Sequence, residues 1–403
     1  MRRPAEGTRV YLLALVSLTA IQIVSTIAFN QASVLAPEAA PALGAAPADI
    51  AYYVSLVYLA ALASTVGAGA LSRRLGPIRF TQIGLAIAGV GSLMFAAGDL
   101  ALAAVSALVV GLGSGPLTIA SSQILARVSP PRLANVTFSL KQSGVPVGFA
   151  LCGALLPTFA LDWGWRGAAA GVGMLSFVGA LAIEPLRATL DTHADGPRPA
   201  RLLPSWSEVI EPVRLALRDP VLRAMCAIGM VFSATQAIVV NFTVVYAVDG
   251  LGMDFVAAGA LLSAATIAGA FGRVFWGVVA DALRRPALVL AGLGAIIAVT
   301  SFAMAFSGPH WPGWLVLAVW IVIGGTAVGW NGVFIAESAY RAPPGRAGEF
   351  TAVTSMFVFA GPLLSPLLFR GLLHATGSYA LGYALLAIAV GACSVFMARA
   401  ARR

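Results

Sequence analysis

The chain has 403 residues, of which 59% are hydrophobic and only 10% are charged, and its mean hydropathy is +0.90. Soluble domains carry about 25% charged residues. A water-soluble fold could not bury this much apolar surface, so we expect lipid to be the solvent for much of the chain. The net charge of +9 does not indicate a nucleic-acid partner, because the basic residues are scattered in short loops instead of forming a stripe.

The sequence offers no pattern typical of an enzyme. It has no nucleotide-binding glycine loop followed by a strand, no metal-ligand cluster and no pairing of a nucleophile with a base. The three histidines, His193, His310 and His374, lie in or near loops, and the three cysteines fall inside apolar runs. We therefore expect no catalysis, no cofactor and no metal site, and we expect gradients to supply the energy for any work that the chain does.

Hydropathy predicts an all-α membrane protein. A helix needs about 20 apolar residues to cross a bilayer, and twelve such runs occur. They lie at about 10–30, 50–71, 80–98, 101–125, 134–158, 167–185, 221–246, 256–280, 287–307, 314–337, 350–372 and 379–398. We predict a Pro- and Ala-rich external loop between the first two spans.

The basic residues predict the orientation of these spans. If the N-terminus is cytoplasmic, all 25 Lys and Arg residues fall on the cytoplasmic side except Lys141, Arg166, Arg273 and Arg370. Positive charge is retained on the cytoplasmic side of membrane proteins. We therefore expect an integral protein of the bacterial inner membrane with both termini in the cytoplasm.

One long internal segment divides the spans into two groups of six. Residues 186–219 begin as a flexible stretch and continue with a capping box, Ser205 to Glu208, which predicts a short amphipathic helix at the membrane surface. We predict a six-helix bundle over 1–185, a cytoplasmic linker over 186–219 and a second six-helix bundle over 220–403.

Two related stretches support a duplicated architecture. The stretch GAFGRVFWGVVADALRRP occupies 269–286, and Gly-Ala-Leu-Ser-Arg-Arg-Leu-Gly occurs 208 residues before the second half of it. Each follows the second span of its half, as expected for a parallel repeat. The residues of the two stretches that carry the pattern are Gly69, Arg73, Arg74 and Gly76 in the first half and Gly277, Asp281, Arg284 and Arg285 in the second.

Two six-helix halves, a long central loop and this motif after spans 2 and 8 resemble the major facilitator superfamily. The resemblance implies the fold of that family and a conformational latch or gate at the eight motif residues. The motif acid, present as Asp281, is replaced by Arg73 in the first half, and the arginine that the family pattern places in span 4 is absent, since Ala107 stands four residues before Gly111.

Two cations lie at membrane depth, where a charge costs at least about 2.5–3.5 kcal/mol. Lys141 is eight residues into span 5 and Arg273 is eight residues from Asp281, so each lies about 12 Å from a helix end. In the resembled fold, spans 5 and 8 lie near each other. One interpretation is an anion site, with Lys141 as a point charge and Arg273 as a planar fork. In the other, Lys141 reaches the interface and Arg273 caps carbonyls or pairs with Glu337.

Local motifs resemble particular groups of carriers. Arg273 and Gly277 are similar to the span-8 pattern of oxalate/formate antiporters and monocarboxylate carriers, in which the arginine binds a substrate carboxylate. The second cation of the oxalate carriers, in span 11, is absent. The stretches 139–148 and 329–334 resemble uncharacterised bacterial carriers near the cyanate-transporter group.

Uncharged polar residues gather in spans 1, 4, 7 and 10, which line the cavity in the resembled family. Each such residue has interhelical hydrogen bonding as an alternative role. Gln22 and Gln236 are 214 residues apart and could be counterparts in the two halves. Besides Lys141 and Arg273, the predicted substrate-binding residues are Gln22, Asn30, Tyr58, Gln123, Gln236, Asn241, Trp330 and Asn331.

We predict a secondary active transporter that moves a small organic anion, such as a monocarboxylate, by alternating access. Glu337 is the candidate for proton coupling, with pairing to Arg341 or Arg346 as the alternative. A proton-coupled drug or metabolite exporter is a second interpretation, although no acid stands inside an apolar run of the first half. A transporter-like membrane sensor is a third. The expected partners are an anionic small molecule, the lipid bilayer and protons, and the expected oligomeric state is a monomer.

Overall fold

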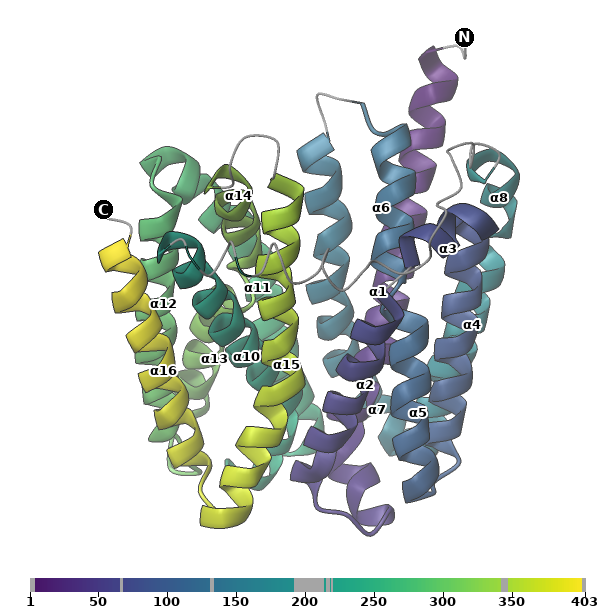
Figure 1. Ribbon diagram of the computed structural model, residues 1–403. Helices are drawn as coiled ribbons and strands as arrows, with labels where there is room; N and C mark the ends of the chain where they lie inside the picture. The colour runs from purple at the N-terminus through teal and green to yellow at the C-terminus, as the bar shows by residue number, and fades with distance from the viewer. Residues whose placement is uncertain are drawn as a thin grey trace. The chain divides into compact units, whose positions relative to one another are not determined.

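The fold is described by a computed structural model that covers residues 4–65, 68–130, 134–191, 214, 218, 220–341 and 347–400 (Figure 1). Helices account for nearly all of these residues, and no strand occurs among them. Contacts between residues divide the chain into two units. Unit 1 comprises 1–45 and 56–204, and unit 2 comprises 46–55 and 205–403.

The main helix contacts of unit 1 are those of α1 with α7 and of α4 with both α5 and α7. Its first helix is longer than the sequence predicts, and its longest helix, α7, is interrupted at Gly164, where φ is 71° and ψ is 161°. The helices are α1 (Pro4–Ala42), α2 (Ile50–Thr65), α3 (Ala68–Leu75), α4 (Pro77–Ala96), α5 (Leu100–Ser114), α6 (Leu117–Val128), α7 (Ala134–Ala182) and α8 (Glu184–Leu190), with a short 3-10 turn η1 (Pro47–Asp49) before α2.

In unit 2, α10 packs against α15 and α12 against α16, as α1 and α4 pack against α7 in unit 1, and α11 packs against α13. The start of α2 belongs to unit 2 by its contacts. Arg370 Nε lies 2.6 Å from Asp49 Oδ1, and Ser55 Oγ donates to the carbonyl of Leu363 at 2.9 Å. The helices are α10 (Pro220–Asp249), α11 (Phe255–Leu283), α12 (Pro286–Ala305), α13 (Gly313–Ala327), α14 (Asn331–Arg341), α15 (Ala347–Thr376) and α16 (Tyr379–Ala400).

Eleven helical segments of the described chain are long and apolar enough to cross a membrane. One of them, Leu140–Leu190, has 51 residues. At 1.5 Å per residue it exceeds twice the roughly 30 Å of a hydrocarbon core, so with its interruption at Gly164 it is long enough for two passes. The all-helical membrane fold predicted from hydropathy is thus confirmed, and this single long segment covers most of predicted span 5 and all of predicted span 6.

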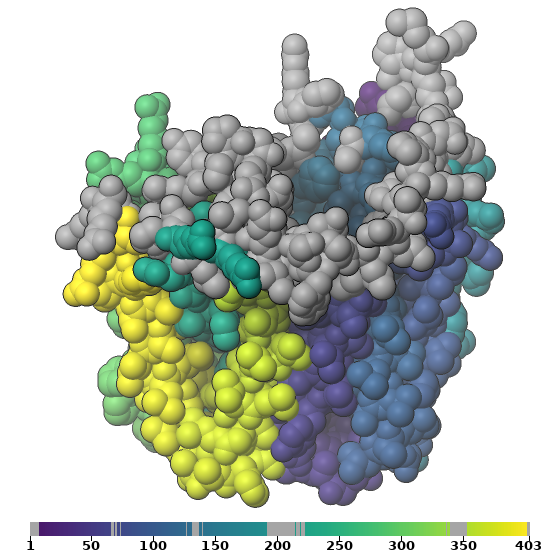
Figure 2. Space-filling view, in the orientation of Figure 1, coloured from purple at the N-terminus to yellow at the C-terminus, as the bar shows by residue number. Residues whose placement is uncertain are grey.

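Large apolar side chains are exposed along these helices. Phe271 of α11 is 74% exposed, and on α16, part of which is seen in yellow on the face drawn in Figure 2, Ile388 is 66% exposed. Leu381, Leu385, Ile388 and Val395 of α16 recur at helical spacing, which makes one continuous apolar stripe. Such stripes suit contact with lipid, which satisfies apolar side chains as well as a protein core does.

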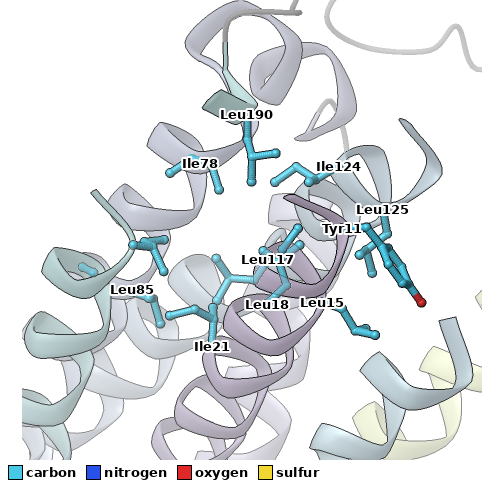
Figure 3. Packing of buried hydrophobic residues seen from close by; sticks show 13 residues of the cluster. Tyr11, Leu15, Leu18, Ile21, Ile78, Leu85, Leu117, Ile124, Leu125 and Leu190 are labelled. Carbon is cyan, nitrogen blue, oxygen red and sulfur yellow. The ribbon is translucent and has the colours of Figure 1, made fainter. Parts of the chain in front are cut away.

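The interior of unit 1 holds a core to which five helices, α1, α4, α6, α7 and α8, contribute side chains (Figure 3). Figure 3 shows Leu18 of α1 close to Leu117 of α6, with Leu190 of α8 beside Ile78 of α4. The hydroxyl group of Tyr11 points away from this cluster and bonds Thr137 Oγ1 of α7 at 2.8 Å. The core therefore fixes α1 against its neighbours at the level where the polar residues of the candidate site begin.

One sequence-based prediction about elements is wrong. The stretch that follows Asn30, predicted as an external loop, continues α1 as far as Ala42, because alanine-rich sequence favours a helix even with Pro37 and Pro41 inside it. The predicted spans 101–125 and 314–337 are found as the membrane-capable segments Leu100–Leu125 and Gly313–Ile335, each with an interruption that the sequence analysis did not predict, between α5 and α6 and between α13 and α14. The predicted linker helix near 205–216 lies almost entirely outside the described residues.

Candidate functional site

Lys141 is a buried cation inside unit 1. It lies on α7 and is 1% exposed. It shares a stripe of that helix with Thr137, which bonds Tyr11 of α1, and with Gly144, where a Cβ would lie 3.1 Å from Gln22 Cβ. Its ammonium donates one long hydrogen bond, 3.4 Å, to Gln142 Oε1. Within the described residues no carboxylate lies within ion-pair distance of it, so a group with three N–H donors is buried with one weak partner.

Gln22, the first glutamine of the candidate site, contacts a residue next to the break between α5 and α6 in the fourth span. Gln22 of α1 is buried, and its Oε1 accepts a hydrogen bond from Thr118 Oγ1 at 3.3 Å. Thr118 comes directly after the interruption between α5 and α6, at Gly115 and Pro116. Since Gly144 of α7 approaches the same glutamine, Gln22 and Lys141 lie within about one helical turn of each other along the contact between α1 and α7.

The second glutamine meets the equivalent break in unit 2. Gln236 Oε1 on α10 accepts from Trp330 Nε1 and from Asn331 Nδ2, each at 3.1 Å. Trp330 lies in the turn that follows α13, and Asn331 is the first residue of α14. The predicted correspondence of Gln22 with Gln236 therefore extends to the environment of the two side chains, because each accepts a hydrogen bond from the first residues after a helix break.

Arg273 lies on α11, and its side chain contacts the backbone at the same break, between α13 and α14. Its Nε donates to the carbonyl of Val328 at 3.2 Å, and one turn later Trp276 Nε1 donates to the carbonyl of Gly325 at 2.9 Å. Val328 caps the C-terminal end of α13. Of the two roles that the sequence allows for Arg273, this contact matches carbonyl capping.

Comparisons with known proteins agree with this arrangement. The profile described as Major Facilitator Superfamily matches residues 18–366. The chain belongs to the Major Facilitator Superfamily. It is 26% identical over 276 residues to an uncharacterized MFS-type transporter, MT3072, of Mycobacterium tuberculosis (strain CDC 1551 / Oshkosh), and the match spans 67% of this chain and 58% of that relative's length.

Solved structures of superfamily transporters share the fold. A crystal structure of a mutant peptide transporter POT superimposes with a TM-score of 0.77 at 16% identity, covering 96% of this chain and 95% of that one. A POT family transporter in complex with 5-aminolevulinic acid gives 0.76 at 12% identity over the same shares. A bacterial homologue of the human lysosomal transporter Spinster, inward-facing and unoccupied, gives 0.68 at 18% identity, covering 100% and 96%. These likenesses, all under 25% identity, show that this chain has the fold of these transporters.

Four further predicted binding residues of this superfamily member have distinct environments. Asn30 is 1% exposed and its Nδ2 has no hydrogen-bond partner, whereas Asn241 Nδ2 donates back to the carbonyl of Ala237 within α10 at 2.8 Å. Gln123 Oε1 accepts from Ser72 Oγ of α3 at 2.9 Å. Tyr58 packs edge-on against Phe29, with ring centroids 4.9 Å apart. Gln123 thus joins the motif region of its unit, and Asn30 is the one of the four with an unsatisfied buried donor.

Glu337, the residue predicted for proton coupling, lies on α14 and is 1% exposed. It makes polar contacts and is not a free carboxylate. Its side chain belongs to unit 2, as does that of Arg273, and the acid follows the α13–α14 break by two turns. Burial of this carboxyl is compatible with a role in coupling and equally with the predicted pairing, so proton coupling stays a prediction.

The two motif stretches form helix–turn–helix corners. Gly76 has φ 90° between α3 and α4, and Arg284 has φ 50° between α11 and α12. These two residues are separated by the same 208 positions as the sequence repeat. Asp281 is exposed, and no ion pair joins it to Arg284 or Arg285 within the described residues. The repeat is therefore visible in the backbone, while the latch remains a prediction.

An acid that the sequence-based interpretation missed lies at the first corner. Asp191, which follows α8, accepts from the backbone N–H groups of Ile78 and Arg79 at 2.8 and 3.2 Å, and its carboxyl group lies against Gly76. It caps the N-terminus of α4 from a distance of 113 residues in sequence. Although the motif acid is replaced by Arg73, a carboxylate still reaches this corner from another helix. Local sequence gives no signal for it.

Proposed function

We propose that this transporter moves a small organic anion across the membrane by alternating access, and that Lys141 binds the anionic group. The observation that carries the proposal is the burial of the Lys141 ammonium at 1% exposure, with one hydrogen bond of 3.4 Å and no carboxylate within ion-pair distance among the described residues. A buried charge without a partner is costly, and a bound carboxylate would supply both the charge and the missing acceptors.

The neighbours of Lys141 suit a small polar ligand. Gln22, whose amide oxygen accepts from Thr118, packs against α7 at Gly144, about one helical turn along that helix from Lys141, and Gly144 removes side-chain bulk from the surface of α7 facing Gln22. An ammonium is a compact point charge that accepts carboxylates in several orientations. This favours small monocarboxylates over large or cationic compounds, because a cation would be repelled by the same charge.

Binding of matched anions tests the proposal. The purified full chain is titrated with butyrate and with butyramide, and thermal stability is followed, since a ligand stabilises the folded state in proportion to the logarithm of its concentration over Kd. We expect butyrate to bind at least about tenfold more tightly than butyramide, and we expect Lys141→Gln to abolish this preference, because a charge-assisted hydrogen bond contributes about 1.5–3 kcal/mol.

The matched control for this titration is Arg79→Gln. Arg79 is an exposed cation of unit 1 that lies at the start of α4, so its removal changes the net charge by the same amount. It should leave the preference for butyrate intact. An equal loss in both variants would mean that general electrostatics explains the preference, and an unchanged preference in Lys141→Gln would refute the proposed site.

A further inference from the structure

The α5–α6 break and the α13–α14 break are built on corresponding helix contacts. In unit 1 a Cβ on Gly111 of α5 would collide with the carbonyl of Val57 on α2. In unit 2 a Cβ on Gly324 of α13 would collide with the carbonyl of Ala265 on α11. Val57 and Ala265 are 208 residues apart, which is the offset of the sequence repeat, and the two glycines are 213 residues apart. The α2–α5 contact inside unit 1 therefore corresponds to the α11–α13 contact inside unit 2.

In unit 2, side chains of α11 donate to the backbone at the break. Trp276 Nε1 donates to the carbonyl of Gly325, and Arg273 Nε donates to the carbonyl of Val328. The last carbonyls of a helix have no partner within the helix, so these two donors satisfy groups that would otherwise be orphaned. Because a guanidinium stays protonated, this break holds a positive charge against backbone carbonyls.

The corresponding donors are missing from unit 1. At the 208-residue offset, Trp276 corresponds to Ala68, which has no polar side chain, and Arg273 corresponds to Thr65. The hydroxyl of Thr65 donates to the carbonyl of Leu62 within its own helix, at 2.6 Å. The α5–α6 break therefore receives neither of the two donors that α11 supplies in unit 2.

Two backbone carbonyls at the α5–α6 break have no hydrogen-bond donor in the described part of the chain. At the 213-residue offset they are the carbonyls of Leu112 and Gly115, which correspond to those of Gly325 and Val328. In a continuous helix the carbonyl of Leu112 would accept from the N–H of residue 116. That residue is a proline, which has no N–H, so the acceptor is freed by the sequence itself.

Further oxygen atoms lie at the same place. Ser114 is 8% exposed, and its buried hydroxyl has no hydrogen-bond partner. A Cβ on Gly115 would lie 2.6 Å from the carbonyl oxygen of Ala61 and 2.7 Å from Ser64 Oγ, so α2 brings two oxygen atoms against the break. The end of α5 is thus surrounded by acceptors, all of them within unit 1.

Oxygen atoms gathered at the C-terminal end of a helix suit a cation. This end of a helix carries a partial negative charge, and the carbonyls of interrupted helices coordinate sodium ions in transporters. Calcium and magnesium sites are built with carboxylates. The described residues contain no group of His, Cys, Asp and Glu side chains that could hold a metal ion. Neutral oxygen ligands therefore favour a monovalent ion.

We propose that the α5–α6 break of unit 1 binds a sodium ion through Ser114 Oγ and the carbonyls of Leu112 and Gly115. The ion takes the place that corresponds to the guanidinium of Arg273 in unit 2, where the same backbone positions already hold a positive charge. The close approach of α2 to Gly111 and Gly115 favours a small ion. This site is separate from the proposed anion site, because Lys141 is not one of its ligands.

Equilibrium binding of radiolabelled Na⁺ to the purified full chain tests the proposal. Choline chloride keeps the ionic strength constant, because choline is too large for so close a helix contact. We expect saturable binding of one ion per chain, and we expect unlabelled Na⁺ to displace the label at least about tenfold more effectively than K⁺ does. Ser114→Ala removes one ligand and should raise Kd by about fivefold or more.

Two further variants sharpen the test. The backbone at Gly115 and Pro116 is helical, with φ −54°, ψ −49° and φ −74°, ψ −15°. In Pro116→Ala the new N–H can donate to the carbonyl of Leu112 and compete with the ion, so Kd should rise. Ser301→Ala is the matched control, because Ser301 of unit 2 is 1% exposed and its buried hydroxyl also has no partner. It should leave Na⁺ binding unchanged.

Absence of saturable Na⁺ binding by the wild-type chain overturns the proposal and means that water satisfies these oxygen atoms. An unchanged Kd in Ser114→Ala overturns it as well, and so does an equal rise of Kd in Ser301→Ala. Where Ser114→Ala shows no cooperative thermal unfolding, Pro116→Ala decides. A raised Kd in that variant supports the site, and an unchanged Kd contradicts it.

Discussion

At the scale of single residues, three cations that the sequence places away from the cytoplasmic side have different kinds of partner. Arg370 is paired with Asp49 at 2.6 Å, and Arg273 donates to a backbone carbonyl. Lys141 has only an adjacent glutamine oxygen at 3.4 Å. Buried charges in membranes are retained where they have a partner or a task. Lys141 is the only lysine in the sequence, and the absence of a strong partner within the described residues is what supports our proposal that it binds an anion.

Asp191 allows a prediction about a single side chain. Its carboxylate caps the first turn of α4 through the N–H groups of Ile78 and Arg79. Replacing a capping acid by alanine costs about 0.5–2 kcal/mol. We expect Asp191→Ala to lower thermal stability by this amount and Asp191→Asn to cost less, since asparagine keeps one acceptor. Equal stability of Asp191→Ala and the wild-type chain would show that the contact contributes nothing.

The residues of the candidate site were easier to predict than their partners. Polarity inside an apolar span singles out Lys141, Gln236 and Asn331 in the sequence, because each is costly to bury. Their partners depend on tertiary packing. Gln236 lies 94 and 95 residues from its two donors, and the carbonyls that Arg273 and Trp276 reach carry no side-chain signal at all. For Arg273, sequence reasoning therefore left two roles open.

At the scale of elements, the corners and breaks of the helices carry the specific geometry. The corner between α11 and α12 places Arg284 at φ 50°, in the left-handed region, where the equivalent residue of unit 1 is Gly76. Hydropathy located the spans but not these turns, since a break of three residues changes mean hydropathy little. The glycines around 111–116 and 324–329 are the signal from which the two breaks could have been predicted.

Backbone conformation at Arg284 leads to a second prediction. A residue with a Cβ pays roughly 1–2 kcal/mol in the left-handed region, and glycine does not. Arg284→Gly should therefore raise thermal stability by about 0.5–1 kcal/mol after its larger loss of chain entropy. Arg285→Gly is the control, because Arg285 has φ −140° and should not be stabilised. A lower melting temperature for Arg284→Gly would contradict this account.

Helix contacts through glycine lead to a third prediction. A Cβ on Gly324 of α13 would collide with the backbone of Ala265 on α11, whereas nothing lies within 4 Å of a Cβ on Gly292 of α12. We expect Gly324→Ala to cost about 1–3 kcal/mol through overpacking. Gly292→Ala should instead stabilise the chain by about 0.5–1 kcal/mol, because alanine favours a helix over glycine. Thermal melting of both variants checks the opposite signs.

At the scale of the whole molecule, duplication explains the placement of the polar groups. The offset of 208 residues relates the two corners, and the offset of 214 relates Gln22 to Gln236, each at a break in its unit. The two halves have diverged in charge: unit 1 carries the buried ammonium of Lys141, and unit 2 carries a capped arginine and an amide–tryptophan cluster. A duplicated frame thus carries different polar groups in its two halves.

The central claim is that the superfamily fold here transports an organic anion through Lys141. Its most direct test is uptake of radiolabelled butyrate and other small monocarboxylates into proteoliposomes that contain the wild-type chain, Lys141→Gln or Arg79→Gln. The account predicts saturable uptake of at least one of these anions by the wild-type chain and by Arg79→Gln, with at least tenfold lower uptake by Lys141→Gln at low substrate concentration. Uptake by Lys141→Gln at the wild-type rate, or no saturable uptake of any of these anions by the wild-type chain, would contradict it.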